Sequence, residues 1–246
     1  MSQIDIIIPS FNLPEYLSPC LTSILRNSDS DELNSVIVIN NGTPESLLGF
    51  PSHPKVKLYQ QEKNLGWEGG LKMGLAVSEA PFVIFMNDDT FIPRASHGWL
   101  DSMLRLFKSE HVGAVGPTSN CVMGGQAMGA FFDGDVIESP FLVGFCVMLR
   151  REALDKAGGV DDDLPNHGDD IDFSIRLRKA GYKLLIDRNT FVFHHGFKTG
   201  ERIMGAYWNS MEMQDKTNHS LIRKHGLREV LATLVLPKYG VYTNGL

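Results

Sequence analysis

Two adjacent carboxylates stand where an apolar segment ends, in Asn87-Asp88-Asp89 after residues 82–86 (FVIFM). A buried strand that ends in neighbouring acids gathers negative charge at one edge of a sheet, which is costly unless a cation or a donor-rich ligand compensates it. Carboxylate oxygens suit Mg²⁺ or Mn²⁺, ions that commonly bridge protein carboxylates and substrate phosphates. The pattern predicts a metal-assisted site for a diphosphate; its structural alternative is a turn or a helix cap.

A second acidic cluster, Asp169-Asp170-Ile171-Asp172, opens an amphipathic segment that ends at Gly181. In a structural interpretation, Asp169 or Asp170 caps this helix and favours its positive end. In the functional interpretation one of them is a general base, because a neighbouring carboxylate and partial desolvation raise its pKa and make it a better proton acceptor. Asp172 and Arg176 are four residues apart, so we expect them to pair on the helix.

A third cluster is His194-His195, followed by Gly196. An imidazole ligand would shift the preference of the site toward Mn²⁺, because transition metals accept nitrogen more readily than Mg²⁺ does. The alternative is a structural role for both histidines. The Gly-rich segment from Asn64 to Gly70 opens a helix and lacks a Walker or dinucleotide fingerprint, so it indicates either a close approach to a ligand or a close helix–sheet contact.

The elements that must position these residues alternate between apolar strands and helices. Residues 4–9, 36–39 and 56–59 are predicted strands, and residues 14–25 carry apolar side chains at helical spacing. Near-continuous apolar strands of this kind indicate a parallel sheet covered on both faces, in which ligands gather at the carboxyl ends of the strands. The polar segments 10–12, 40–42 and 88–89 all fall at such ends.

The second half of the chain continues this alternation with one long interruption. Residues 117–140 are rich in Gly, Met and Ser and lack periodicity, so we expect a functional loop region that lines the cleft. The other expected elements are a helix over 98–108, strands over 112–115, 142–149, 183–186 and 191–193, a helix over 171–180, and helical structure from 205 to about 224.

Composition narrows the class of protein. The 246 residues suffice for one α/β domain, and a net charge of −6 with a pI near 5.7 argues against a nucleic-acid-binding surface. Three widely spaced cysteines, Cys20, Cys121 and Cys146, indicate a reducing compartment. The sequence has neither a secretory leader nor a run of about 18 apolar residues, so we expect a cytoplasmic protein without a transmembrane segment, able to meet a lipid-linked substrate at the inner face of the membrane.

Taken together and in order, these motifs resemble those of the inverting family 2 glycosyltransferases of the GT-A fold, in particular the bacterial rhamnosyltransferase-like branch. The matching segments run from residue 4 to about residue 200 and comprise 6–12, 39–42, 64–66, 87–90, 116–120, 168–173 and 194–199. The resemblance implies a Rossmann-like, mostly parallel central sheet with helices on both faces and a C-terminal helical segment. It also implies one domain, with a nucleotide-sugar-binding half (1–116), an acceptor and catalytic half (117–204) and a helical extension (205–246).

The resemblance also implies roles for individual residues. Asp89 and His194 would bind Mn²⁺ or Mg²⁺, with His195 as the alternative ligand, and Asp170 would be the catalytic base, with Asp169 in the position of the family's Glu. Asn120 and Gln126 would help to shape the acceptor site. The nucleotide of the sugar donor would be surrounded by Pro9, Ser10, Phe11, Asn12, Asn40, Asn64, Gly66, Asn87 and Asp88.

Three positions depart from the family pattern. Asn40 stands where many relatives have an Asp that contacts the base, Lys72 replaces a common Asn, and Asp169 is one methylene shorter than Glu. Because of these departures, the identity of the nucleobase and the contacts to the donor sugar stay open. It also stays open whether Asp169 or Asp170 is the catalytic base.

The implied reaction is a single displacement that inverts the anomeric centre and transfers a sugar from a nucleoside-diphosphate donor to a hydroxyl of a glycan, lipid-linked or protein-linked acceptor, in surface polysaccharide or glycan assembly. Two other classes compete with it: a sugar-phosphate nucleotidyltransferase and a non-catalytic module that binds nucleotide sugars or glycans. The first of these usually has a Gly-rich, Arg-containing loop after the first strand, where this chain has Ser10-Phe11-Asn12-Leu13-Pro14.

Overall fold

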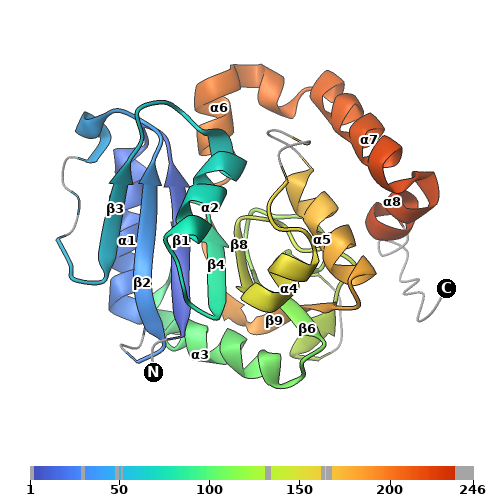
Figure 1. Ribbon diagram of the computed structural model, residues 1–246, viewed down its shortest axis with the longest axis horizontal. Coiled ribbons are helices and arrows are strands. Elements are labelled where there is room, and N and C mark those ends of the chain that lie inside the picture. Colours follow the sequence, from blue (N-terminus) through green and yellow to red (C-terminus); the bar gives the residue numbers. More distant parts are fainter. Residues whose placement is uncertain are drawn as a thin grey trace.

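The first half of the chain alternates strands and helices as its apolar pattern predicts (Figure 1). The structure is a computed structural model that describes residues 3–28, 31–47, 50, 52–130, 134–161, 164 and 168–235. Strand β1 pairs in parallel with β2 and β4, and β2 pairs in parallel with β3. The elements of this half are β1 (Ile4–Ser10), α1 (Pro14–Asn27), β2 (Leu33–Asn40), β3 (Val56–Gln60), α2 (Gly66–Ala76) and β4 (Phe82–Met86).

The second half completes an eight-stranded sheet of order β3-β2-β1-β4-β8-β6-β9-β7, in which the strand directions are mixed. Strand β6 (Val112–Thr118) runs parallel to β9 (Lys183–Phe191). In contrast, β8 (Cys146–Arg150) is antiparallel to β4 and β6, and β7 (Val136–Glu138) is antiparallel to β9. A strand buried on both faces has the same apolar pattern in either direction, so the sequence could not show that β8 is reversed.

Some elements differ from the sequence-based expectations. Residues 142–145 precede β8 instead of belonging to it, and the two expected closing strands are one strand, β9, followed by β10 (Phe193–His194), which pairs with β5 (Thr90–Phe91). The expected loop over 117–140 contains a 3₁₀ turn and β7, and its residues 131–133 lie outside the described residues. The remaining helices are α3 (Trp99–Leu104), α4 (Arg151–Lys156), α5 (Asp169–Lys179), α6 (Lys198–Met204), α7 (Met211–His225) and α8 (Leu227–Leu234).

Two apolar layers cover the two faces of the sheet. Alternate residues of β1 point to opposite faces, so that Ile6 and Ile8 join the cluster under α1 and α3, whereas Ile7 joins the cluster under α2. A Cβ atom at Gly74 would lie 2.3 Å from Cγ2 of Ile7, and one at Gly70 would lie 2.7 Å from Cβ of Pro9. The glycines of α2 therefore provide a close helix–sheet contact, one of the two alternatives for the Gly-rich segment.

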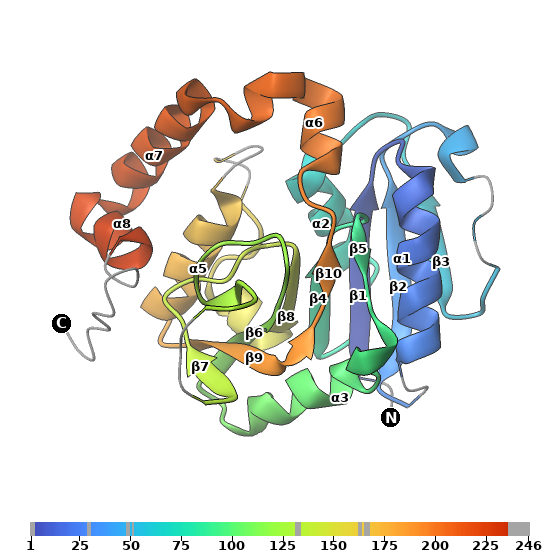
Figure 2. The ribbon, with the colours of Figure 1, turned by 180° about the vertical axis from the view of Figure 1, so that it is seen from behind.

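The C-terminal helices form an arch along the edge of the sheet where β1 and β4 end (Figures 1 and 2). Helix α6 lies near α2, and α7 continues toward α5. A third apolar cluster joins α5 to α7 and α8 and contains Ile175, Leu221 and Val230. Within the described ranges, none of the helices combines the length and apolarity needed to cross a membrane.

Candidate active site

A cleft of about 250 Å³ lies at the carboxyl ends of β1 and β4, where parallel strands direct their following loops to one edge of the sheet. It collects segments that are far apart in the sequence: the end of β1, the turn after β4, the loop before β8 and the start of α5. Ten of the predicted site residues line it: Pro9, Ser10, Phe11, Asn64, Asn87, Asp88, Asp89, Asp169, Asp170 and His194.

Asp88 is almost fully buried, with 2% of its surface exposed. The Ser10 hydroxyl donates to its Oδ2 at 2.7 Å, and Thr199 Oγ1 donates to its Oδ1 at 3.4 Å. Burial raises the pKa of Asp88 to about 7, the hydrogen bond from Ser10 opposes this shift, and the charge of Asp89 adds to it. This carboxyl is therefore poised between its two protonation states near neutral pH.

Asp89 faces His194 across the cleft wall. Asp89 Oδ1 lies 3.2 Å from His194 Nε2, and this buried oxygen accepts no hydrogen bond. His194 Nδ1 lies 3.0 Å from the carbonyl oxygen of Cys121, which can only accept, so Nδ1 carries a proton and the neutral imidazole presents the lone pair of Nε2. Asn87 Nδ2, 3.2 Å from Nε2, donates to the same lone pair.

This pair fits a divalent cation. A cation would compensate the carboxylate oxygen that lacks a donor, and it could accept the lone pair of the nearby imidazole nitrogen. The Cys121 carbonyl holds the proton of the imidazole on Nδ1, as hydrogen-bond partners of metal-binding histidines commonly do. Among the described residues, no group of three or more His, Cys, Asp or Glu side chains is arranged to hold a metal. A cation bound by Asp89 and His194 would therefore take its remaining ligands from water or from a substrate diphosphate.

The backbone of His194 is held by Asn120. The His194 amide donates to Asn120 Oδ1 at 2.9 Å, and Asn120 Nδ2 donates to the His194 carbonyl oxygen at 3.0 Å. The His194 ring stacks on Phe145 with 5.2 Å between centroids. His195, in contrast, is exposed, does not line the cleft, and contacts the rings of Tyr16 and Phe193.

The second acidic pair occupies the first turn of α5. Gly168 precedes it with φ of +81°, and a Cβ there would lie 2.7 Å from Thr217 Cγ2, so both backbone conformation and space call for glycine. Asp170 accepts hydrogen bonds from the amides of Gly144, at 3.1 Å, and of Ile171, at 2.8 Å. The N-cap is Gly168, without a side-chain cap, so neither acid is the cap that the structural interpretation considered.

The surroundings of Asp169 raise its affinity for protons. Burial raises the pKa of Asp169 well above its ordinary value, and the charges of Asp170 and Glu68 raise it further, whereas backbone amides of the first helical turn oppose this shift. Asp169 therefore holds a proton more readily than an ordinary carboxyl does. The carboxylate of Asp170 accepts hydrogen bonds from the amides of Gly144 and Ile171, which favour its charged form.

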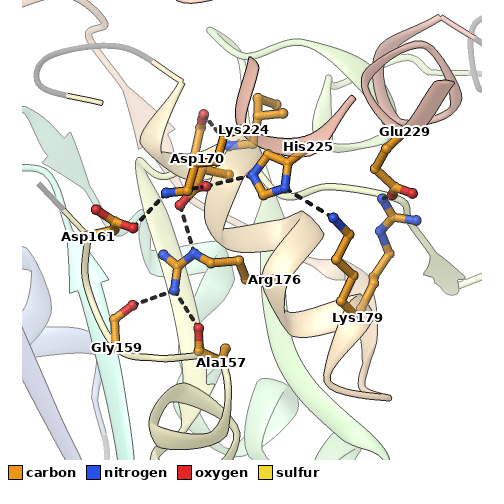
Figure 3. Close-up of polar contacts among 12 residues, drawn as sticks. Ala157, Gly159, Asp161, Asp170, Arg176, Lys179, Lys224, His225 and Glu229 are labelled. Atoms are coloured by element: carbon orange, nitrogen blue, oxygen red, sulfur yellow. Dashed lines mark hydrogen bonds and ion pairs between the residues drawn. The ribbon is translucent and has the colours of Figure 1, made fainter. Parts of the chain in front are cut away.

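Asp172, on α5, belongs to a separate polar network with Arg176, Lys224 and His225, and these three partners are labelled in Figure 3. It pairs with Arg176 as predicted, with 2.8 Å between Oδ2 and Nε, and its Oδ1 also lies 2.8 Å from Lys224 Nζ and 2.7 Å from His225 Nε2. Arg176 donates in turn to the carbonyl oxygens of Ala157 and Gly159. Asp172 thus connects α5 to α7 and to the loop before α5.

Five predicted residues do not line the cleft: Asn12, Asn40, Gly66, Asn120 and Gln126. Asn40 is fully buried, and its amide bonds to the Thr43 carbonyl and to Gln60, so it organises the turn after β2. Its neighbour Asn41 lines the cleft instead. Gln126 is also buried and ties the Pro117 carbonyl to the amide of Val143.

The sequence reasoning missed an entire wall of the cleft. This wall comes from α6 and the 3₁₀ turn Gly205–Asn209 that follows it. The motif at 194–199 pointed toward the region, but no periodicity placed α6 over the cleft. The lining residues contributed by this region and by the loop before it are Phe197, Lys198, Thr199, Gly200, Ile203 and Trp208. Trp67, on α2, also lines the cleft.

Comparison with known proteins identifies related sequences. Residues 5–158 match the family model described as glycosyl transferase family 2. The chain is 24% identical over 221 residues to the O-antigen biosynthesis protein RfbC of Myxococcus xanthus, covering 78% of this chain but only 17% of that protein. It is 26% identical over 237 residues to an uncharacterised protein of Mycobacterium tuberculosis, covering 90% of this chain and 85% of that protein.

Solved structures share the fold at low sequence identity. GalNAc-T7 in complex with UDP, GalNAc and Mn²⁺ superposes with a TM-score of 0.68 at 11% identity, covering 96% of this chain and 58% of that chain. The mannosyltransferase PcManGT of Pyrobaculum calidifontis with GDP-Man and Mn²⁺ gives 0.61 at 14% identity, covering 98% and 76%. The expected α/β fold of the GT-A type is thereby confirmed.

Proposed function

Given that the chain belongs to glycosyl transferase family 2, we propose that it is a metal-dependent, inverting enzyme that moves a sugar from a nucleoside-diphosphate donor to an acceptor hydroxyl. One observation supports this most directly: a single cleft holds both acidic pairs. The buried, unpaired oxygen of Asp89 and the lone pair of His194 lie at one part of it, and Asp169 and Asp170 at another.

The residues around Asp89 suit the leaving diphosphate. Asp89 and His194 would hold Mn²⁺ or Mg²⁺, which when bound neutralises charge on the departing diphosphate. Lys198 also lines this cleft and adds positive charge to it. Ser10 and Thr199 hold Asp88 in place through hydrogen bonds, so that the turn after β4 is fixed before substrate arrives.

Asp170 is the proposed base. It takes the proton from the acceptor hydroxyl while the oxygen attacks the anomeric carbon from the face opposite the diphosphate, so the configuration inverts. The amides of Gly144 and Ile171 donate to the carboxylate of Asp170 and favour the ionised form that a base needs. The amide of Gly144 orients its carboxylate toward the cleft wall formed by residues 143–145.

For the biological role and the nucleobase of the donor, the proposal names only a class. Related proteins include an O-antigen biosynthesis protein, which supports a role in surface polysaccharide or glycan assembly. The side chain of Asn40 bonds within its own turn, so contacts to the nucleobase would come from other residues. The adjacent residue Asn41 lines the cleft and is a candidate for this role.

A thermal-shift panel tests the proposal. Wild-type protein is heated with UDP, dTDP or GDP, each with and without Mn²⁺. At about 100 times its dissociation constant a ligand stabilises by about 2.7 kcal/mol, which for a chain of this length corresponds to a rise in Tm of roughly 5–10 °C. We expect one diphosphate to give a metal-dependent rise that Asp89→Ala abolishes.

The matched control is Asp215→Ala, which removes an exposed acid of α7 and should leave the rise intact. Failure of every diphosphate to stabilise the protein at saturating concentration would contradict the transferase proposal. Release of pyrophosphate during turnover, instead of a nucleoside diphosphate, would identify a nucleotidyltransferase.

A further inference from the structure

The wall of the cleft formed by α6 and its following turn is aromatic and apolar. Phe197, Ile203 and Trp208 line it, and 47% of the Phe197 surface and 48% of the Ile203 surface are exposed. In contrast, Asn120 and Gln126, which the sequence assigned to the acceptor, bond to the His194 backbone and to Pro117 and Val143. The part of the cleft available to an acceptor is therefore bounded by residues 197–208.

The arch of C-terminal helices that carries this wall is anchored at two places. Near its start, Thr199 donates to Asp88, and Arg202 donates to the carbonyl oxygen of Asn12 and to Glu15. At the far end of α7, Lys224 and His225 bond to Asp172 on the helix that carries Asp170 (Figure 3). The arch thus extends from the first acidic pair to the helix of the second, and Trp208 lies between these anchors along the chain.

The Trp208 ring packs directly on the backbone of α6. A Cβ atom at the buried residue Gly200 would lie 2.1 Å from both Cδ2 and Cε2 of the indole, so a residue with a side chain there would displace the ring. Glycine therefore allows the indole to rest against the helix while it also lines the cleft. An aromatic ring held in this way needs little further ordering when a ligand binds.

We propose that Trp208 and Phe197 form an acceptor subsite that binds a pyranose ring of a glycan. A pyranose has an apolar C–H face, which suits an indole surface, and a rim of hydroxyls, which suits the polar groups of the same cleft: Lys198, Thr199, Asp169 and Asp170. An alkyl chain would contact the aromatic wall and form no hydrogen bonds with the polar groups beside it. The inference rests on the proposed function, because it makes Asp170 the group that receives the proton of the stacked sugar's hydroxyl.

Indole resonances provide a direct test. The chain has three tryptophans, Trp67, Trp99 and Trp208, so ¹⁵N-labelled protein gives three side-chain N–H signals, and Trp208→Phe identifies one of them. Methyl glucoside, methyl galactoside and methyl mannoside are titrated into the full-length protein with Mg²⁺ and the diphosphate that stabilises it, and hexanol serves as the apolar probe. We expect at least one glycoside to shift the Trp208 signal in a saturable way while the signal of the fully buried Trp99 stays in place.

Two variants sharpen the result. Gly200→Ala should displace the indole and weaken glycoside binding at least tenfold, while the diphosphate-dependent rise in Tm is retained. Tyr207→Ala removes the neighbouring aromatic residue, which does not line the cleft, and should bind glycosides as the wild type does. The thermal-shift measurement also shows that each variant is folded.

The inference is overturned if none of the glycosides moves the Trp208 signal at tens of millimolar, if hexanol moves it as strongly as they do, or if Gly200→Ala and Tyr207→Ala behave alike. Its failure is distinct from failure of the proposed function. Stabilisation by a diphosphate without any glycoside response refutes only the acceptor subsite. A glycoside response in a protein that binds no diphosphate refutes the transferase and indicates a glycan-binding module.

Discussion

The two acidic pairs of the cleft have the same composition and different surroundings. Asp88 and Asp89 end a central strand, and only 2% and 3% of their surfaces are exposed. Asp169 and Asp170 open α5, are half-buried, and follow a glycine with positive φ. The first pair is held by side chains from several segments, whereas the second receives backbone amides at the start of a helix.

This difference separates their chemistry. Among the described residues no donor bonds to Oδ1 of Asp89, which lies 3.2 Å from Nε2 of His194, and a cation would compensate this buried oxygen. The second pair sits in the field of a helix N-terminus, where burial and neighbouring charges raise the proton affinity of Asp169, and such surroundings suit proton transfer. We therefore expect the two acidic pairs to have different roles, because different structural elements carry them.

The largest expected effect comes from Asp170→Asn. The amide keeps the size of the side chain and removes its ability to take a proton, so kcat should fall by about 10²–10⁴-fold, the usual contribution of a general base. Metal-dependent stabilisation by the diphosphate should remain within twofold in apparent affinity, because Asp170 belongs to the other pair. The measurements are single-turnover transfer and the thermal-shift titration.

Asp215→Asn is the control for this substitution, since it changes the same chemical group at an exposed position of α7. If Asp170→Asn lost both diphosphate binding and turnover, the two pairs would act as one site, which would contradict their separate roles. Full activity in Asp170→Asn and its loss in Asp169→Asn would exchange the two roles within the second pair.

A smaller effect is expected from Asp172→Asn, which tests the third acid of α5. Burial opposes the charge of Asp172, but the hydrogen bonds from Lys224, His225 and Arg176 outweigh it, and the pKa of Asp172 is lowered. Its stabilising contribution is therefore present above the ordinary carboxyl pKa of about 3.8 and is lost as the pH falls through the lowered value. Removing one partner of such a buried network costs about 3 kcal/mol at pH 7.

Urea unfolding at pH 7 and near pH 3 measures this difference, which should shrink at the lower pH. Glu212→Gln breaks an exposed ion pair with Lys216 on α7 and should cost less than about 1 kcal/mol. If Asp172→Asn cost no more than Glu212→Gln, the contact between α5 and α7 would not depend on this network. Unchanged diphosphate binding by the folded variant would separate Asp172 from the two pairs in the cleft.

Much of the donor side of the cleft follows from local pattern. The apolar runs of β1, β2 and β4 and the polar residues after them predict a sheet edge that gathers ligands, and Pro9, Ser10, Asp88 and Asp89 are found together there. The pattern does not show which of two adjacent residues reaches the cleft. Asn40 belongs to β2 and turns inward, whereas Asn41 lies just beyond the strand and reaches the cleft.

The rest depends on contacts between distant segments. Lys224 and His225 reach Asp172 from about fifty positions away, and nothing in either segment alone signals the other. The same holds for Trp208 over Gly200, where a glycine in the first turns of a helix gives no sign of the indole that rests on it. Helical structure was expected from 205 to about 224, and α7 lies largely within this range, but the pattern of neither α6 nor α7 shows against which part of the molecule the helix packs.

The smallest expected effect comes from Asn120→Ala. This substitution tests whether Asn120 supports the metal site or the acceptor site. The resemblance assigned this residue to the acceptor, but its amide holds both backbone polar groups of His194. Partners that orient a metal ligand typically contribute 10–100-fold to metal affinity, and Asn120 contacts the backbone and not the imidazole, so we expect about tenfold weaker Mn²⁺ binding. Electron paramagnetic resonance of free Mn²⁺, titrated with protein and diphosphate, measures it.

Asn189→Ala, at an exposed position of β9, is the matched control and should leave Mn²⁺ affinity unchanged. Unchanged Mn²⁺ affinity in Asn120→Ala, together with weaker glycoside binding, would restore the acceptor assignment. It would also mean that the acceptor reaches the metal side of the cleft and that residues 197–208 do not bound it alone. Weaker Mn²⁺ binding with normal glycoside binding would instead keep the two sides distinct, with His194 positioned by Asn120 and the acceptor positioned by the arch.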